Sequence, residues 1–439
     1  MDQAVTYNPI QQLLRQRAHG AVRGLYSCCS ANAFVLRAAM RRAKATGTIA
    51  LIEATANQVN QDGGYTGMTP EQFRAFVLRI AAEEGLPLDR VFCGGDHLGP
   101  LTWRHLPEAE AMEKAKSLVD RYAAAGFSKI HIDTSMRLAD DDPNQRLPDA
   151  AIARRGALLC KEAERAAQRY RAAHPAAPMP IYVIGSEVPI PGGAMENEDA
   201  VAVTSPEDCQ ATLEAFRAAF AAEGLSDAWN RVVALVVQPG VEFADESVIT
   251  YNRPAAAGLT ALLQAQDALV FEGHSTDYQP RERLREMVQD GIAILKVGPA
   301  LTFALREGLF ALSCIERELA LRESFRPTAL RKTLEQVMLE SPRYWAPYYT
   351  GSEAQQAYAR AYSYSDRVRY YLPDARVDAA IHTLLGNLDR TGLPPALLSQ
   401  YLPRQYARVQ SGLLLPKAAD VLIDRIGDRI DDYLFAILP

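Results

Sequence analysis

The chain has 439 residues, enough for a barrel of about 250 residues with a substantial extension. Its net charge of −6 gives no polybasic surface, so we expect small metabolites as partners and neither nucleic acid nor membrane. Six cysteines without paired spacing suit a reducing cytoplasm, where we place the protein. We expect neither a signal peptide nor a membrane span, because the sequence has no basic start followed by an apolar segment and no long apolar run.

From residue 24 to about residue 317, short β-like runs alternate with longer helical patterns. Several runs are apolar throughout, which is typical of parallel strands covered on both faces. Eight strand-then-helix units predict an α/β protein with a (β/α)₈ TIM barrel. A doubly wound open sheet is the alternative, but no dinucleotide-binding glycine fingerprint opens the first helix. The predicted strands are 24–30, 48–54, 91–94, 129–133, 181–187, 232–237, 268–272 and 292–297.

The strand pattern stops near residue 318, and the remaining sequence is helical and rich in tyrosine. We therefore predict a barrel over residues 1–317 and an all-helical C-terminal extension over residues 318–439. The tyrosines of the extension are compatible with the core of a small helical domain, an oligomer interface or a lid over the barrel mouth. We also expect a homo-oligomer.

Asp96 and His97 follow the third predicted strand. A carboxylate beside an imidazole can supply a proton-transferring group and a metal ligand at one reacting carbon. Neighbouring residues on a strand point to opposite faces, so both reach one site only if the strand ends or bends there. Gly94 and Gly95 would permit that bend and a close approach to a ligand. The alternative is a capping aspartate and a histidine packed in a loop.

Further residues of the types that bind metal ions follow the fifth and seventh predicted strands. His97 and His274 with one carboxylate form a sufficient ligand set for Zn²⁺ or a related divalent ion. Glu272 lies two residues before His274, and Glu187 ends the fifth strand before a loop rich in proline and glycine. The alternatives are that His274 caps the next helix and that Glu187 binds loop amides.

The fourth strand alternates, so His131 and Asp133 share one face. We predict Asp133 at the barrel mouth as a catalytic candidate and His131 one layer below in a structural role.

Other polar residues cluster after strands, where a TIM barrel keeps its active site. A loop rich in amides and glycine follows the second strand and suits a polyol. Residues 296–299 join the last strand to a helix, which is a common place to hold phosphate. No phosphate-binding loop of the GxxxxGK[ST] type supports a nucleotide-dependent kinase. The predicted substrate-binding residues are Glu53, Asn57, Gln238, Ser275, Asp277 and Lys296.

Several long segments of the sequence are distinctive. They are IEATANQVNQ (52–61), GGYTGMTP (63–70), GGDHLGP (94–100), GFSKIH (126–131), VVQPGVEF (236–243), HSTDYQ (274–279), LKVGPALTFALRE (295–307) and SQYLP (399–403). Together they resemble the GatZ/KbaZ family, the Z-type subunits associated with tagatose-1,6-bisphosphate aldolase. The resemblance runs nearly end to end and reaches the extension.

The resemblance implies a barrel related to class II, metal-dependent aldolases, in which Asp96 would transfer protons and His97 would bind the metal. Two further metal histidines are expected after later strands in that pattern. The sequence departs from it there, because Gln238 stands at the first of these positions and Glu272 at the second, with His274 two residues on.

Two functions remain open on this resemblance. The leading hypothesis is a metal-dependent epimerase that inverts C4 between tagatose and fructose, or their 6-phosphates, by retro-aldol cleavage. A Zn, Mn or Ni ion would be held by His97, His274 and a carboxylate from Glu272 or Glu187, with Asp96 or Asp133 as base. The alternative is a non-catalytic subunit that stabilises a Y-type catalytic subunit of the aldolase. A tagatose-6-phosphate kinase ranks third.

Overall fold

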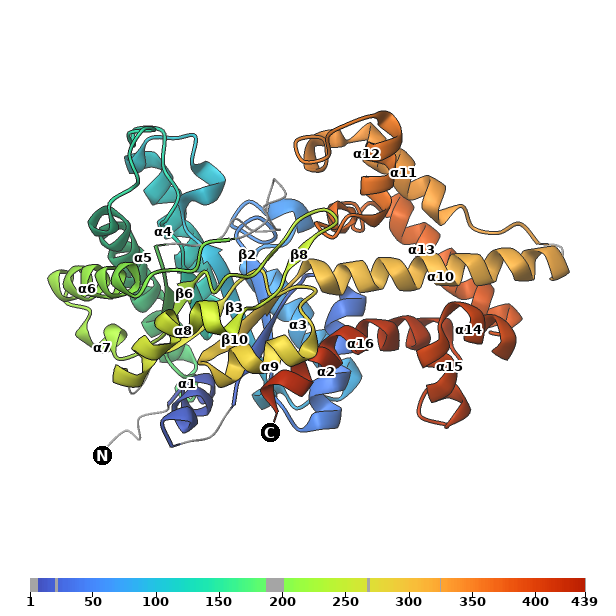
Figure 1. The fold of residues 1–439 in the computed structure, drawn as a ribbon, viewed down its shortest axis with the longest axis horizontal. Coiled ribbons are helices and arrows are strands. Elements are labelled where there is room, and N and C mark those ends of the chain that lie inside the picture. The colour runs from blue at the N-terminus through green and yellow to red at the C-terminus, as the bar shows by residue number, and fades with distance from the viewer. Residues whose placement is uncertain (1–6, 20–22, 187–200, 267–268, 324, 439) are drawn as a thin grey trace.

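Eight parallel strands close into a barrel in the order β1-β10-β9-β6-β5-β4-β3-β2, which confirms the predicted TIM barrel (Figure 1). The computed structural model describes residues 7–19, 23–186, 201–266, 269–323 and 325–438. The barrel strands are β1 Leu25–Cys29, β2 Ala50–Thr55, β3 Val91–Leu98, β4 Lys129–Ile132, β5 Ile181–Ile184, β6 Val232–Val237, β9 Val270–Gly273 and β10 Ile292–Val297. A short antiparallel hairpin of β7 Glu242–Phe243 and β8 Val248–Ile249 follows β6.

Helices surround the barrel, and their ends carry the expected signals. The first barrel helix, α2, begins where the Asn32 side chain accepts the amides of Phe34 and Val35, and it ends at the left-handed Gly47. The helices up to the end of the barrel are α1 Pro9–Arg15, α2 Ala33–Thr46, α3 Pro70–Glu84, α4 Glu108–Ala124, α5 Asp149–Ala173, α6 Pro206–Ala222, α7 Ser226–Trp229, α8 Arg253–Ala261, α9 Arg281–Gln289 and α10 Pro299–Glu323.

The region after α10 is helical, as predicted. It contains α11 Leu330–Glu340, α12 Glu353–Tyr362, α13 Ala375–Thr391, α14 Pro395–Tyr401, α15 Pro403–Gln410 and α16 Ala418–Ile437. Helix α10 runs without a break from the barrel into this region, so the predicted boundary at residues 317 and 318 falls inside it. Helix α16 returns and packs against α2, α9 and α10 (Figure 1). The division into two domains stays a prediction.

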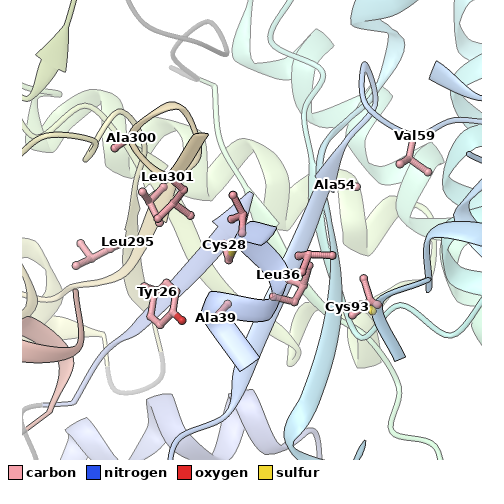
Figure 2. Close-up of a cluster of buried hydrophobic side chains, with 14 of the residues drawn as sticks. Tyr26, Cys28, Leu36, Ala39, Ala54, Val59, Cys93, Leu295, Ala300 and Leu301 are labelled. Atoms are coloured by element: carbon pink, nitrogen blue, oxygen red, sulfur yellow. The ribbon is translucent and has the colours of Figure 1, made fainter. Parts of the chain in front are cut away.

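One apolar layer lies between the barrel and its helices. Figure 2 shows outward-facing side chains of the strands, such as Tyr26 and Cys28 of β1, against Leu36 and Ala39 of α2 and Leu301 of α10. Burying a side chain of this size contributes about 1.5–3 kcal/mol, so this layer is the main source of stability. Among the described residues, no helix is long and apolar enough to cross a membrane.

The barrel interior is divided into an apolar lower part and a charged upper part. Leu25, Leu51, Ile181 and Ile294 fill the lower part together with Ile10 of α1, which belongs to the same cluster. One pleat further along β1, β2 and β10 come the buried side chains of Ser27, Glu53 and Lys296, and the buried side chains of Lys129 from β4 and Glu272 from β9 lie with them. The charged part lies at the carboxyl ends of the strands, where a TIM barrel places its chemistry.

Gly94 makes room for a side chain of this charged part. A Cβ at residue 94 would lie 2.8 Å from both Cγ and Oε1 of Glu53. A Cβ at residue 95 would meet Leu98 at 2.4 Å. Both glycines are therefore required by neighbouring protein atoms, which corrects the expectation that they let the backbone approach a ligand.

Gly94→Ala should destabilise the barrel by about 1–3 kcal/mol, because the added methyl group overpacks a buried site beside Glu53. Urea unfolding measures the loss. The control is Gly386→Ala in α13, where a Cβ meets nothing within 4 Å and the substitution should stabilise by about 0.5–1 kcal/mol. Equal stability of Gly94→Ala and the parent would contradict the packing argument.

Candidate functional site

Asp96 and His97 lie within β3, because this strand extends to Leu98 instead of ending at the predicted residue 94. The pairing of β3 with β4 shifts register between Gly95 and Leu98, and His97 has a φ of 49°. Such a bulge lets two consecutive side chains serve the same face of a strand. A positive φ is uncommon for a residue with a side chain, and strained positions of this kind cluster at functional sites.

Three histidine rings meet above the charged part of the barrel. The centroids of His97 and His131 are 5.0 Å apart, those of His97 and His274 are 4.8 Å apart, and those of His131 and His274 are 5.1 Å apart. They come from β3, β4 and the segment just after β9. The rings thus form a nearly equilateral triangle in which each ring contacts the edge or face of the other two.

Each of the three imidazoles is held by a carboxylate. His97 Nδ1 lies 2.9 Å from Asp133 Oδ2, and His131 Nδ1 lies 2.9 Å from Asp96 Oδ1. His274 Nε2 lies 3.0 Å from Glu272 Oε1. A carboxylate of this kind fixes the orientation and tautomer of a metal-binding histidine.

The carboxylates are ionised. Burial opposes their charge, but a hydrogen bond from His97 lowers the pKa of Asp133 to about 2. The charges of Lys296 and His97 outweigh burial at Asp96 and hold its pKa well below the ordinary value. Lys129 and Lys296 do the same for the pKa of Glu272. An ionised carboxylate only accepts hydrogen bonds, so the ring nitrogens of His97 and His274 that face Asp133 and Glu272 carry a proton. His131 Nδ1 faces both Asp96 and the backbone amide of His97, which donates to it at 3.1 Å.

When the ring is neutral, the other nitrogen of His97 or of His274 presents a lone pair. Burial lowers the pKa of His274 to about 3, which keeps its ring neutral. His97 is different, because Asp96 and Asp133 outweigh burial and raise its pKa. His131 Nε2 is buried and has no hydrogen-bond partner. An unpartnered buried nitrogen is costly in a protein interior, so its position points to a ligand.

These residues form a set that fits a divalent ion. Asp96, His97, His131 and His274 each offer one ligand atom, and these atoms lie within 4.8 Å of one another. His131 therefore joins the site, although the sequence predicts a structural role for it. The sequence signal for His131 is that it shares a face with Asp133. Because β4 has only four residues, a side chain one layer below Asp133 still lies at the mouth of the barrel.

Glu272 and Glu53 lie just below the three rings and are tied to two lysines. Lys129 Nζ is 2.7 Å from Glu53 Oε1 and 2.8 Å from Glu272 Oε2. Lys296 contacts Glu53 and lies 2.8 Å from Asp96 Oδ1. The sequence analysis does not identify Lys129, whose side chain is completely buried. Glu272 thus orients His274 and pairs with Lys129, and it stands outside the group of four possible ligands.

A cavity of about 510 Å³ opens above the rings. The helical extension contributes Arg369, Tyr370 and Leu372 to its wall. The Tyr370 ring lies 4.7 Å from the ring of Tyr65, which follows β2. The extension therefore covers part of the barrel mouth, as in the third of the roles considered for its tyrosines.

The predicted site residues divide into four groups. Those that line the cavity are Asn57, Asp96, His97, His274, Ser275, Asp277 and Lys296. Glu53, Asp133 and Glu272 are buried beneath it, and Gln238 uses its side-chain oxygen to accept the amides of Gly240 and Val241 in a turn. Glu187 lies outside the described residues.

Asp277 occupies the helix start at which the sequence predicts a phosphate site. Its Oδ1 accepts the amides of Gly298 at 3.0 Å and Ala300 at 2.8 Å. Burial raises the pKa of this carboxyl to about 6. The amides at the start of α10 are therefore already engaged, and a phosphate there would meet a carboxyl group.

One family model matches nearly the whole chain, and this match shows the family of the protein. Residues 10–438 match the model described as D-tagatose-1,6-bisphosphate aldolase subunit GatZ/KbaZ-like. The chain belongs to the GatZ/KbaZ-like family. This confirms the resemblance found in the sequence and places the protein in tagatose-related carbohydrate metabolism. The family description names an aldolase subunit, so it also implies a partner subunit.

One solved structure is similar over nearly the whole chain, and others are more distant. A crystal structure described as a probable tagatose 6 phosphate kinase from Sinorhizobium meliloti 1021 is 46% identical, covers 94% of this chain and 100% of its own, and has a TM-score of 0.85. The fructuronate-tagaturonate epimerase UxaE from Cohnella laeviribosi is 11% identical over 94% of this chain and 82% of its own, with a TM-score of 0.44. A fructose-bisphosphate aldolase from Campylobacter jejuni is 12% identical over 85% and 90%, with a TM-score of 0.43. The last two likenesses are too remote to bear on function.

Asp277→Asn should change how stability depends on pH. The pKa of the Asp277 carboxyl group is about 3.9 in the unfolded chain and about 6 in the folded protein. Protonated Asp277 therefore stabilises the fold fully below about pH 4, and this contribution is lost as the pH rises through about 6. The asparagine variant keeps an acceptor for both amides, so its stability relative to the parent should rise by up to ~3 kcal/mol between pH 4 and pH 7.

Urea unfolding of both proteins across this pH range measures the difference in unfolding free energy. The exposed Asp89, changed to asparagine, serves as control and should give a difference that varies little with pH. A constant difference for Asp277→Asn would contradict the raised pKa.

Proposed function

We propose that the chain is a divalent-metal-dependent epimerase that inverts C4 of a ketohexose, tagatose or fructose, or of its 6-phosphate. The observation that carries the proposal is the triangle of three imidazoles, each held by a carboxylate, at the floor of a cavity large enough for a sugar. The family membership supports a sugar of the tagatose type.

His97, His131 and His274 would hold the ion, with Asp96 beside them. Three nitrogen ligands suit Zn, Mn or Ni and leave positions open for substrate oxygens. This set replaces Glu272 by His131, because Glu272 already pairs with Lys129 and His274. When bound, such an ion polarises the C2 carbonyl of the ketose, which favours cleavage of the C3–C4 bond.

Cleavage is needed because C4 is not next to the carbonyl and its hydrogen is not acidic. Asp96 is the proposed base. Its Oδ1 is held by Lys296 Nζ at 2.8 Å and His131 Nδ1 at 2.9 Å, while Oδ2 lies 3.7 Å from Cys29 Sγ and 3.9 Å from His97 Nε2. Oδ2 is thus the oxygen that takes the proton of the C4 hydroxyl as C3–C4 breaks.

The two fragments are then the enediolate of a three-carbon ketone and a three-carbon aldehyde. Rotation of the aldehyde presents its other face, C3 attacks it, and Asp96 Oδ2 returns the proton to the new C4 oxygen. The ammonium of Lys296 lines the cavity beside Asp96 and adds positive charge next to the developing enediolate. Asp133 positions His97 and does not touch the substrate, since its carboxylate is engaged by His97 and Ser135.

A second candidate is favoured by the family description, which names an aldolase subunit. In that role the chain would bind and stabilise a Y-type catalytic barrel. A rise in aldolase activity when the purified chain is added to a Y-type subunit would support it.

The test of the leading proposal is an incubation of the purified chain alone with fructose 6-phosphate or tagatose. Mn²⁺, Ni²⁺ and Zn²⁺ are added separately, and EDTA is added afterwards. We expect the C4 epimer to form with at least one metal and its formation to stop with EDTA. Asp96→Asn should lower the rate at least about 100-fold, as expected for removal of a general base. The absence of epimer with every metal would refute the proposal.

Metal binding is tested separately from turnover. His131→Ala should lose at least about tenfold in affinity for Zn²⁺, measured by calorimetry on the metal-free chain, because it removes one of three nitrogen ligands. His174→Ala is the control, since His174 is exposed and lies on the side of the barrel against Tyr170. Unchanged affinity in His131→Ala would show that His131 is not a ligand.

A further inference from the structure

We infer that the helical extension supplies an anion subsite, centred on Arg369, that binds the phosphate of a phosphorylated ketose. The inference rests on the proposed function for the identity of the sugar. It names the substrate class, a ketose phosphate, and gives the extension a part in substrate binding.

Among the lysines and arginines that line the cavity, Arg369 differs from the others in its partners. Arg37 is paired with Glu83 and Glu84 at 2.5 and 2.7 Å. Lys296 is paired with Glu53 and Asp96. Asp366 acts on Arg369 through its charge, but no ion pair with a carboxylate of the described residues is formed by Arg369. Of these three cations, Arg369 is therefore the one without a direct ion pair.

Arg369 also retains free hydrogen-bond donors. It lies in the 3₁₀ turn Arg367–Tyr370 between α12 and α13. One guanidinium nitrogen, Nη1, donates to the carbonyls of Ser365 and Asp366, and Nη2 donates to the Tyr370 hydroxyl at 3.2 Å. A guanidinium has five N–H groups, so Nε and one proton of Nη2 have no protein acceptor in the described part of the chain. Two N–H groups of this kind match two phosphate oxygens.

A second arginine adds positive charge behind Tyr370. Arg367 is 4% exposed, its Nε has no hydrogen-bond partner, and its guanidinium lies 3.4 Å from the centre of the Tyr348 ring. Burial and the charge of Arg369 lower the pKa of Arg367, and no carboxylate of the described residues offsets them. Two nearby arginines without a direct ion pair are costly to bury, and a bound anion reduces that cost.

Two other groups at the cavity that could hold a phosphate are already engaged. The amides at the start of α10 are taken by Asp277, and the lysine at the barrel mouth is neutralised by two carboxylates. A phosphate held by Arg369 leaves the carbon chain of the same ligand for the imidazoles, which border the same cavity. The extension would thus bind one end of the sugar phosphate and the barrel the other.

The experiment measures binding to the metal-free full chain by calorimetry, so it needs no turnover. The three ligands are fructose 6-phosphate, fructose and inorganic phosphate. The parent should bind fructose 6-phosphate at least tenfold more tightly than fructose, and inorganic phosphate should compete with it. Arg369→Gln should lose at least tenfold in affinity for fructose 6-phosphate and inorganic phosphate and change little towards fructose.

The matched control is Arg343→Gln, which removes the same charge from an exposed arginine stacked on Tyr344, outside the cavity. It should keep the preference for the phosphorylated sugar. Arg369→Lys keeps a donor for the Ser365 and Asp366 carbonyls, so it separates the loss of the phosphate contact from misfolding. It should lose several-fold in affinity for fructose 6-phosphate. Parent-like binding of this sugar phosphate by a folded Arg369 variant would overturn the inference.

The two proposals fail in different ways. If the preference for phosphate depends on Arg369 but no epimer forms, the subsite stands and the epimerase does not. If epimer forms and Arg369→Gln binds fructose 6-phosphate as the parent does, the epimerase stands and the subsite does not. A parent that binds fructose and fructose 6-phosphate equally also overturns the subsite.

Discussion

The contact between a carboxylate and one nitrogen of each histidine is the constraint on which the site depends. It orients the three rings, and at His274, which burial keeps neutral, it fixes which nitrogen carries the proton and which presents a lone pair. The contacts draw on β3, β4 and β9 and on the residues that directly follow β4 and β9. Because these strands are not all neighbours, only a closed barrel brings the three pairs together.

The carboxylates in turn need the two lysines below them. Burying a charge without a partner is costly, and Lys129 and Lys296 each contact two of the acidic side chains. Glu53, Asp96 and Glu272 carry three negative charges against two positive ones. The balance leaves the floor of the cavity electronegative, which favours a cation there. Burying these charged side chains costs stability, and the apolar packing around the barrel offsets that cost.

The fold could be predicted from the sequence because each strand is a short apolar run bounded by helical periodicity. The position of Asp96 and His97 at the mouth could be predicted for the same reason. The bulge at His97 could not, since a register shift depends on how β3 meets β4 and leaves no local signal. Lys129 has no sequence signal and His131 is predicted only in a structural role, because their partners lie on other strands. A buried lysine is recognised only once Glu53 and Glu272 are seen beside it.

Gln238 is predicted to bind substrate, but its side-chain oxygen is engaged elsewhere. It follows a strand and stands where the aldolase pattern expects a histidine, yet its side chain closes a turn through the amides of Gly240 and Val241. Position along the chain thus identifies the right end of the barrel, but not the direction in which a side chain points.

Helix α10 is continuous from the barrel into the helical extension. Its 25 residues span about 37 Å at 1.5 Å per residue, and its near end is fixed beside Lys296 and Asp277. A tilt of roughly 5° about that fixed end displaces the far end by about 3 Å over such a length. A single continuous helix therefore joins the distal helices to the amides that Asp277 holds at the cavity.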